Sequence, residues 1–258
     1  MTESSPTLAT APVECCLNRG FKHEGTSVGK VVTVAGVKTY VSMPNGCDNQ
    51  EQKRIILFFS DVFGPFSNNA KLLQDYYASE GFIVLGVDYF LGDPIDAHLG
   101  QKNEAADAWF DAWLTMAVRR AAMCTPPWIE AVEGLYGHEV KYCAVGYCFG
   151  APFVMDFAAK DDVAAAAFAH PGNLNESHFE KLRAPLLLSC AENDNTFSAE
   201  SRRRAEDIMV KNKASYHIQV FSGVEHGFAA RGDPTNENIR WAKEESARSI
   251  IGWFKRFT

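Results

Sequence analysis

The stretch from Val140 to Phe157 constrains the fold of this chain more than any other. An apolar run that favours a strand leads into Gly146, and Cys148, Gly150 and a helical pattern follow in turn. This G-x-C-x-G spacing is the cysteine form of the nucleophile elbow, a sharp strand-to-helix turn. Small neighbours let the backbones pass closely at such a turn. We therefore expect Cys148 to be a nucleophile, the alternative being a structural cysteine at a tight β-α turn.

The helix that follows this turn supports the same interpretation. If it begins near Phe149, as the pattern indicates, its first backbone N–H groups point toward the site. Unpaired N–H groups at a helix N-terminus stabilise nearby negative charge. They would favour both a thiolate on Cys148 and an oxyanion formed beside it.

Strand and helix patterns alternate along the rest of the chain. Apolar runs predict buried strands at 54–59, 82–87, 164–168, 185–190 and 216–221, and a hairpin near the sheet edge at 30–41. The alanines of 164–168 would also suit a helix. Helices are predicted at 67–80, 103–123, 198–211 and 236–254. A break is expected at Pro126-Pro127, before a short helix that ends near Tyr136.

This alternation is the signature of an α/β fold with a mostly parallel central sheet and helices on both faces. The chain has 258 residues, a length that one α/β domain can use. We expect a single domain over residues 28–258. Residues 1–27 carry little periodic signal and form an N-terminal segment that is packed on the body or extends from it.

The composition excludes several classes of function. The formal net charge is -7 and no long basic run occurs, so nucleic acid and membrane surfaces are not expected partners. No apolar stretch approaches the roughly 18 residues of a membrane span. Residues 1–12 lack the apolar core of a secretory signal. The seven cysteines are odd in number and irregularly spaced, which favours reduced thiols and a cytoplasmic protein.

A nucleophilic thiol needs a general base and a group that orients this base. His226 lies in a glycine-flanked loop after the last predicted strand, and a hydrogen-bonded loop histidine is the alternative. Asp194, in the loop after the preceding strand, is the expected acid; the alternatives are Glu192 and a turn-forming role for Asp194. His170 also follows a strand, but it precedes the acid in the chain. We interpret it as a hydrogen-bonded structural histidine.

The elbow, Asp194 and the segment His226-Gly227-Phe228 together resemble the dienelactone hydrolase family of α/β-hydrolases. The resemblance spans about residues 31–254, and the early Cys15-Cys16 pair with the later His-Glu-Gly-Thr stretch is similar to the fungal branch. It implies the α/β-hydrolase fold and a triad of Cys148, Asp194 and His226. It also implies that the oxyanion donors are the backbone amides of Val62 and Phe149.

Two departures from the family pattern matter: the first concerns the partner of the resting thiol, and the second concerns the substrate. Bacterial members carry a glutamate that partners the resting thiol where this chain has Asp61, which either reaches Cys148 or only caps the next helix. The loop that holds their first arginine reads Tyr89-Phe90-Leu91-Gly92 here, and Arg231 lies one residue further from the histidine than their second arginine. We expect substrate contacts from a mostly neutral, aromatic set with one cation: Phe63, Tyr89, Phe228 and Arg231.

We expect a hydrolase that cleaves a small ester or lactone through a Cys-His-Asp triad and an acyl-cysteine. Neutral esters should be turned over at least as well as dienelactones that carry a carboxylate. No cofactor is expected, and no metal, because no His/Cys/carboxylate set has ligand spacing. The chain would act as a monomer or homodimer. Two alternatives are a thiol-based redox protein, which would want a resolving cysteine nearby, and a non-catalytic binding module on the same fold.

Overall fold

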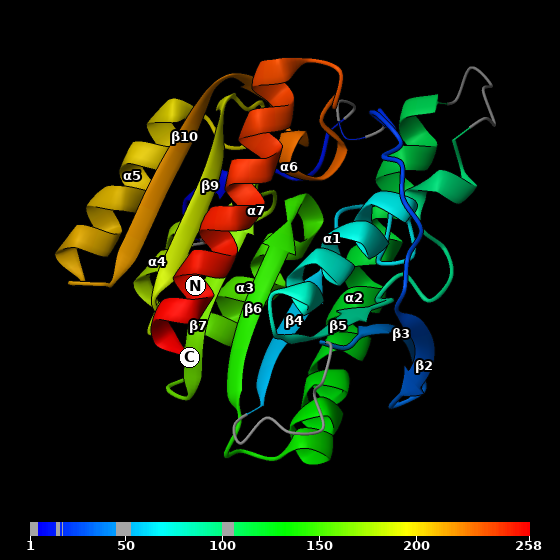
Figure 1. The fold of residues 1–258 in the computed structure, drawn as a ribbon. Coiled ribbons are helices and arrows are strands. Elements are labelled where there is room, and N and C mark those ends of the chain that lie inside the picture. Colours follow the sequence, from blue (N-terminus) through cyan, green and yellow to red (C-terminus); the bar gives the residue numbers. More distant parts are fainter. Residues whose placement is uncertain (1–4, 14–15, 17, 45–52, 100–105) are drawn as a thin grey trace.

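Eight strands form the central sheet of the computed structural model (Figure 1). They are β2 (Lys30–Val34), β3 (Val37–Ser42), β4 (Arg54–Phe59), β5 (Ile83–Val87), β6 (Lys141–Tyr147), β7 (Val163–Ala169), β9 (Leu186–Asn193) and β10 (Tyr216–Glu225). Their order is β10-β9-β7-β6-β4-β5-β3-β2, and all neighbours are parallel except β5–β3 and β3–β2. The predicted strands and the edge hairpin are therefore confirmed, including the alanine-rich strand β7.

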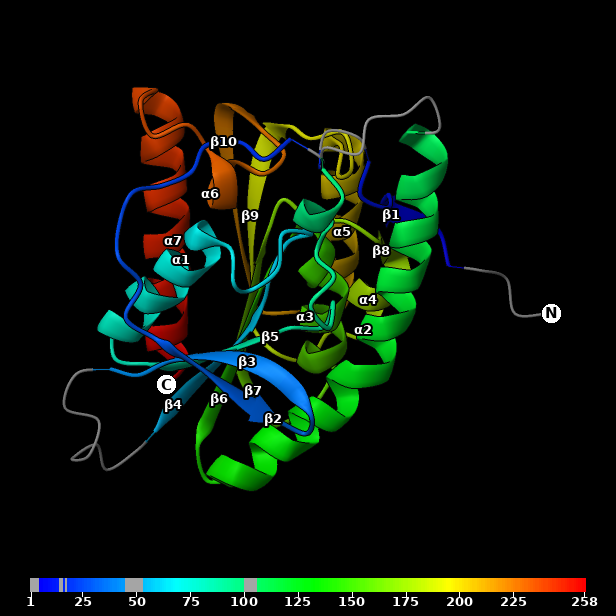
Figure 2. The ribbon, with the colours of Figure 1, turned by 90° about the vertical axis from the view of Figure 1, so that its right-hand side faces the viewer.

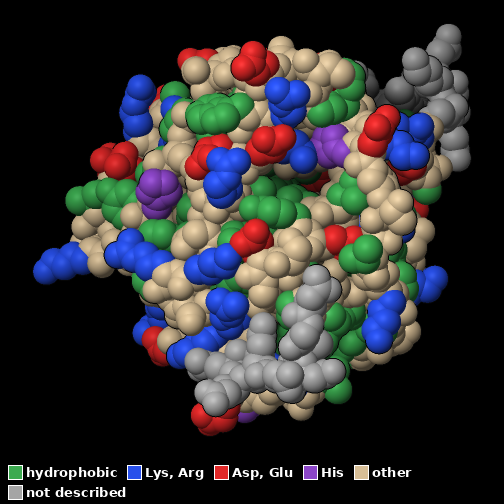
Figure 3. All heavy atoms as spheres, in the orientation of Figure 1, with side chains coloured by type: hydrophobic (Ala, Val, Ile, Leu, Met, Phe, Trp, Pro, Cys, Tyr) green, Lys and Arg blue, Asp and Glu red, His purple; other side chains and the backbone are tan. Residues whose placement is uncertain are grey.

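The structure describes residues 5–13, 16, 18–44, 53–99 and 106–258. Cys15, whose role the sequence leaves open, lies outside these residues. Within them, no helix is long and apolar enough to cross a bilayer. On the face seen in Figure 3, acidic and basic side chains are interspersed.

Helices cover both faces of the sheet (Figure 2). They are α1 (Asn68–Ser79), α2 (Ala106–Tyr136), α3 (Ala151–Ala158), α4 (Glu176–Glu180), α5 (Ala199–Lys211), α6 (Phe228–Arg231) and α7 (Glu237–Phe257). Two short 3₁₀ turns, η3 (Ile95–Ala97) and η4 (Cys148–Gly150), lie in the loops. Two hydrophobic cores lie on the two faces of the sheet. In the first core, α2, α3, α4 and α5 pack on one face, and in the second core, α1, α6 and α7 pack on the other.

Strand β4 shows why both faces are apolar. Side chains alternate between the two faces of a strand. Ile55, Leu57 and Phe59 belong to the first core, whereas Ile56 and Phe58 belong to the second. A parallel strand buried on both faces therefore reads as one continuous apolar run.

The break expected at Pro126-Pro127 is wrong, because α2 runs from Ala106 to Tyr136 with both prolines inside it. A proline in a helix interior removes a hydrogen bond and costs about 3 kcal/mol. Packing offsets this cost. Trp128 is fully buried, and its indole N–H donates to Thr39 Oγ1 at 2.8 Å.

The N-terminal segment lies against the body of the protein, where β1 (Thr7–Ala9) pairs with β8 (Leu174–Asn175). It then crosses the end of the sheet at which the parallel strands finish (Figure 2, blue). There Phe21 N donates to Arg231 O at 3.1 Å. His23 Nε2 lies 3.0 Å from the Gly232 carbonyl oxygen. The segment therefore covers the end of the sheet where the predicted site residues gather.

Candidate active site

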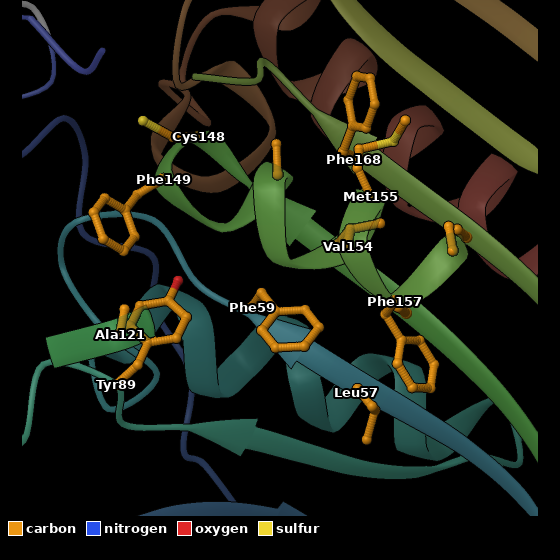
Figure 4. Close-up of a cluster of buried hydrophobic side chains, with 14 of the residues drawn as sticks. Leu57, Phe59, Tyr89, Ala121, Cys148, Phe149, Val154, Met155, Phe157 and Phe168 are labelled. Atoms are coloured by element: carbon orange, nitrogen blue, oxygen red, sulfur yellow. The ribbon is translucent and has the colours of Figure 1, made fainter. Parts of the chain in front are cut away.

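Cys148 occupies the expected strand-to-helix turn, between β6 and α3. Its φ is +49°, a left-handed conformation that is uncommon for a residue with a side chain. A Cβ at Gly146 would lie 2.8 Å from the Gly150 carbonyl oxygen, and one at Gly150 would lie 2.2 Å from the Phe59 carbonyl oxygen. Gly146 is therefore needed for the elbow to close on its own helix, and Gly150 is needed for the turn to pack against β4. Figure 4 shows the Cys148 side chain pointing away from the apolar cluster.

His226 is held by a carboxylate in the way a general base requires. Its Nδ1 lies 2.9 Å from Asp194 Oδ1 and 3.0 Å from Thr196 Oγ1. Thr196 also donates to Asp194 Oδ1 through its hydroxyl at 2.7 Å and its backbone amide at 2.9 Å. Glu192, the alternative acid, instead accepts a hydrogen bond from Gly223 N at 2.7 Å near the surface. The structure thus brings Asp194, and not Glu192, to His226.

The ionisation of this pair follows from its burial and its charges. Burial alone would lower the pKa of His226, but the hydrogen bond and charge of Asp194, with the neighbouring Cys16 thiol, raise it above its usual value. Burial acts to raise the pKa of Asp194, and the contacts with His226 and Thr196 more than reverse this, so its pKa is lowered. The lowered pKa of Asp194 and the raised pKa of His226 both favour a carboxylate beside an imidazole that readily takes a proton.

A second thiol, from the N-terminal segment, lies inside the site. Cys16 Sγ is 3.6 Å from Cys148 Sγ, and both residues are fully buried. These two sulfurs and a ring nitrogen of His226 lie within 4.8 Å of one another. Nε2 is buried and has no hydrogen-bond partner in the part of the chain that the structure describes. In the sequence Cys16 stands out only as part of the Cys15-Cys16 pair, because no spacing relates it to the distant elbow.

Asp61 pairs with Arg231 rather than with the thiol. Arg231 Nη1 donates to Asp61 Oδ2 at 2.6 Å, and both side chains are buried. Asp61 Oδ1 accepts from Phe63 N at 3.0 Å. The guanidinium carbon of Arg231 lies 5.0 Å from the centre of the Phe63 ring. Among the described residues, Asp61 makes no hydrogen bond to Cys148, so its carboxylate neutralises the arginine.

Val62 and Phe149, whose amides are the expected oxyanion donors, lie just beyond the ends of the neighbouring strands β4 and β6. Phe59 at the end of β4 is paired with Gly146 of β6, so the loop that holds Val62 lies beside the elbow. The Val62 amide donates no hydrogen bond to any described residue, whereas that of Phe63 is used by Asp61. Phe149 directly follows the nucleophile and turns its ring toward Tyr89, 5.4 Å away between centroids (Figure 4).

A cavity of about 670 Å³ lies next to the site. Its walls include Asp61, Phe63, Arg231, Tyr147 and residues 19–22 of the N-terminal segment. Cys148 and the other two triad candidates are not among its lining residues.

Two of the four expected substrate contacts, Phe63 and Arg231, line this cavity, and the other two do not. Tyr89 is fully buried, and its hydroxyl donates to the Ser60 carbonyl oxygen. Phe228 is buried in the second core against Phe221. Both side chains are aromatic, as expected for substrate contacts, but they are buried in the protein and do not line the cavity.

The expectation that His170 is hydrogen-bonded through its side chain is wrong. The residue is fully buried with φ +36°, and neither ring nitrogen has a hydrogen-bond partner among the described residues. Burial, reinforced by His226 and Arg231, lowers the pKa of His170 well below its usual value, so the ring is neutral. It lies edge-on to the His226 ring, 4.9 Å between centroids, and contacts Tyr147 and Phe228. His170 thus supports the ring of the candidate base.

Comparison with known proteins adds independent findings. The model of the dienelactone hydrolase family matches residues 37–258. The chain is 35% identical to "Dienlactone hydrolase 1" of Gibberella moniliformis over 253 residues, 97% of this chain and 95% of that protein. It is 31% identical to "Hydrolase pyvD" of Aspergillus violaceofuscus, over 95% of this chain and 97% of that protein.

Among solved structures, the fold is similar to that of a putative dienelactone hydrolase from Klebsiella pneumoniae. The TM-score is 0.66 at 16% identity, and the match covers 90% of this chain and 100% of the bacterial one. At this identity the likeness is one of fold, and it confirms the predicted α/β-hydrolase architecture.

Proposed function

Since the chain belongs to the dienelactone hydrolase family, and is therefore a hydrolase of carboxylic esters or lactones, we propose that it acts through Cys148, His226 and Asp194. The observation that carries this proposal is the orientation of His226. Its Nδ1 is held by Asp194, while its Nε2 is turned to the thiols with no other partner among the described residues.

The first half of the reaction forms an acyl-enzyme. The Cys148 thiolate attacks the carbonyl carbon, a C–S bond forms, and the carbonyl oxygen becomes an oxyanion. The amides of Val62 and Phe149 donate hydrogen bonds to it, each worth about 3–4 kcal/mol in comparable sites. His226 Nε2, which has taken the thiol proton, gives it to the leaving alkoxide as the C–O bond breaks.

The second half releases the acid. A water molecule gives a proton to His226 Nε2 and attacks the acyl carbon, and the C–S bond breaks to restore the cysteine. Asp194 and Thr196 keep the proton of the neutral imidazole on Nδ1, so that Nε2 always faces the reaction.

The substrate class follows from the Asp61–Arg231 pair. A free arginine beside the pocket would bind a substrate carboxylate. Here Asp61 already satisfies the buried guanidinium, and the Phe63 ring covers it. We therefore propose that neutral esters and lactones are turned over at least as well as lactones that carry a carboxylate.

A panel of nitrophenyl esters and lactones, combined with intact-mass spectrometry, tests this proposal. Cys148→Ala should abolish turnover, and wild-type protein mixed with a slow ester should gain one acyl mass on the Cys148 peptide. Cys190→Ala removes a buried thiol in β9 and should retain both activity and adduct. An acyl group found on Cys16, or turnover that survives Cys148→Ala, would refute the assignment of the nucleophile.

A thiol-based redox protein is the second candidate, because Cys16 now supplies the nearby thiol that this function needs. A hydroperoxide would oxidise Cys148 to a sulfenic acid, and attack by Cys16 would release water and leave a disulfide. If this is the main function, hydroperoxide should be consumed catalytically in the presence of a thiol reductant, and ester turnover should be negligible.

A further inference from the structure

We propose that Cys16, Cys148 and His226 form a binding site for Zn²⁺ that switches the hydrolase off reversibly. The three ligand atoms come from the N-terminal segment, the elbow and the loop after β10, and they lie within 4.8 Å of one another. Metal binding itself is independent of the reaction proposed above; only its effect on turnover rests on that function.

The separations suit a tetrahedral ion. Zinc binds cysteine sulfur at about 2.3 Å and histidine nitrogen at about 2.0–2.1 Å. Two sulfurs bound in this way lie roughly 3.8 Å apart, and sulfur and nitrogen roughly 3.6 Å apart. The observed distance from Cys16 Sγ to Cys148 Sγ is 3.6 Å. Only small rotations of the side chains are therefore needed to bring all three atoms onto one ion.

The surroundings of His226 also suit a metal ligand. A histidine that binds zinc usually donates its other ring N–H to a carboxylate or a carbonyl, which orients the ring. Asp194 holds Nδ1 of His226 in this way at 2.9 Å. The remaining nitrogen, Nε2, is buried, faces the sulfurs and has no hydrogen-bond partner among the described residues. The ring of His226 is thus already oriented for Nε2 to bind a metal ion.

Charge favours an ion at this position. Two thiolates so close together in a buried site would repel each other, and one divalent cation neutralises both. The buried Arg231 is paired with Asp61, which offsets its positive charge near the site. On binding, two S–Zn bonds and one N–Zn bond form, and the two thiol protons pass to the solvent.

Inhibition follows directly from the identity of the ligands. The ion would hold both the nucleophile and the base, leaving one coordination position for water. Neither attack on an ester nor proton transfer by His226 is then possible. Removal of the ion by a chelator would restore both groups. A catalytic triad without a second thiol would offer only two of these three ligands. Cys16 supplies the third and should raise the affinity for Zn²⁺.

The experiment uses full-length protein, reduced with a phosphine and freed of metal. Co²⁺ serves as the spectroscopic probe, and Zn²⁺ affinity is measured by competition with a coloured chelator. Wild type should bind one Co²⁺ with intense thiolate-to-cobalt absorption, and one equivalent of Zn²⁺ should displace it. Cys16→Ser and His226→Gln should each weaken Zn²⁺ binding by more than the roughly 10–100-fold typical of an outer-shell change. Cys190→Ala should bind as wild type does.

Several outcomes would overturn the site. They are wild-type binding weaker than that of free thiols, a cobalt spectrum without thiolate absorption, or unchanged Zn²⁺ affinity in Cys16→Ser. If Cys16→Ser does not fold, Asp194→Asn tests the same site through the orientation of His226, and an unchanged affinity there counts against it. Should no ester be cleaved while the cobalt spectrum is present, the hydrolase mechanism fails and the metal site stands. Ester cleavage that Zn²⁺ does not inhibit would refute the metal switch and leave the hydrolase mechanism in place.

Discussion

Asp61 and Arg231 form a buried ion pair, and the loss of either residue would leave an uncompensated charge in the interior. Removing one member of such a pair typically costs about 3–5 kcal/mol. Arg231→Ala should therefore lower the free energy of unfolding by about this amount, because Asp61 stays buried without its partner. Arg183→Ala breaks an exposed ion pair with Asp161 and should change the free energy of unfolding by no more than about 1 kcal/mol.

Urea denaturation of the two variants measures this difference. Equal effects would mean that the Asp61 carboxylate reaches water in solution. Arg231→Lys keeps the charge but loses the planar guanidinium, and it should recover part of the stability.

We expect Asp194 and Glu192 to differ in function, although only one residue separates them at the end of β9. In Asp194→Asn the neutral amide can donate to Nδ1 of His226 as well as accept from it, so it no longer fixes the productive tautomer. We expect kcat to fall by on the order of 10⁴-fold, as in a serine protease triad, with little change in thermal stability. Glu192→Gln loses only a surface contact and should stay near wild type. Steady-state kinetics on one nitrophenyl ester compares them, and a larger effect at Glu192 would mean that the acid is wrongly assigned.

At the scale of elements, the elbow depends on how closely α3 approaches β4. A Cβ at Gly150 would lie 2.2 Å from a backbone oxygen of Phe59, which cannot rotate away. Gly150→Ala should cost at least about 1–3 kcal/mol through forced backbone shifts, and it should abolish ester turnover. Gly252→Ala is the matched control, since a Cβ there meets open space within α7. That change should leave activity intact and stabilise the protein by up to about 1 kcal/mol.

Thermal unfolding and activity together report on both variants. Normal activity in Gly150→Ala would show that the elbow tolerates a wider turn than its contacts indicate.

Local patterns predict the elements of this fold well, because central strands such as β4 and β6 are buried on both faces and read as apolar runs. Long-range packing is the part that they miss. The break predicted at Pro126-Pro127 depends on backbone chemistry alone, whereas Trp128, which belongs to α2, ties this helix to Thr39 of the distant strand β3. Similarly, a polar side chain such as His170 suggests a hydrogen-bond partner, but its neighbours are aromatic rings. Neither effect can be found without the positions of distant residues.

The residues of the candidate site also fall into two groups, those that local patterns predict and those that only long-range packing brings together. The elbow glycines, Asp194 and His226 lie at or just beyond the ends of β6, β9 and β10, and the ends of parallel strands meet at one edge of the sheet. The sequence therefore places them together. Cys16 belongs to no strand or repeat, and only the path of the N-terminal segment brings it to Cys148. The partner of Asp61 is likewise visible only once α6 is in place.

For the molecule as a whole, Asn69 fastens the N-terminal segment over the site. Its side-chain amide donates to Phe21 O at 2.8 Å and Ala230 O at 3.1 Å, and its Oδ1 accepts from His23 N at 2.9 Å. Asn69→Ala should lose roughly 1–3 kcal/mol of stability and loosen residues 19–23. We expect faster hydrogen exchange in this segment and faster iodoacetamide labelling of Cys148.

Two controls belong to this measurement. Asn212→Ala removes a single 3.3 Å surface contact with Glu180 and should change neither rate. Cys143 and Cys190 are internal references, because burial raises the pKa of Cys143 and raises that of Cys190 to about 12, so both stay protonated at neutral pH. Labelling of these two at the rate of Cys148 would indicate general unfolding instead of a loosened segment.

The position of Cys16 beside a nucleophile 132 residues away also has a kinetic consequence. Contacts between distant parts of a chain carry the largest loop-closure entropy and tend to form late. During refolding, the parallel sheet can restore its far-UV signal before the N-terminal segment closes over the elbow. Cobalt absorption that needs all three ligands would then appear after the sheet, so the order of the two signals would show when the chain finishes folding.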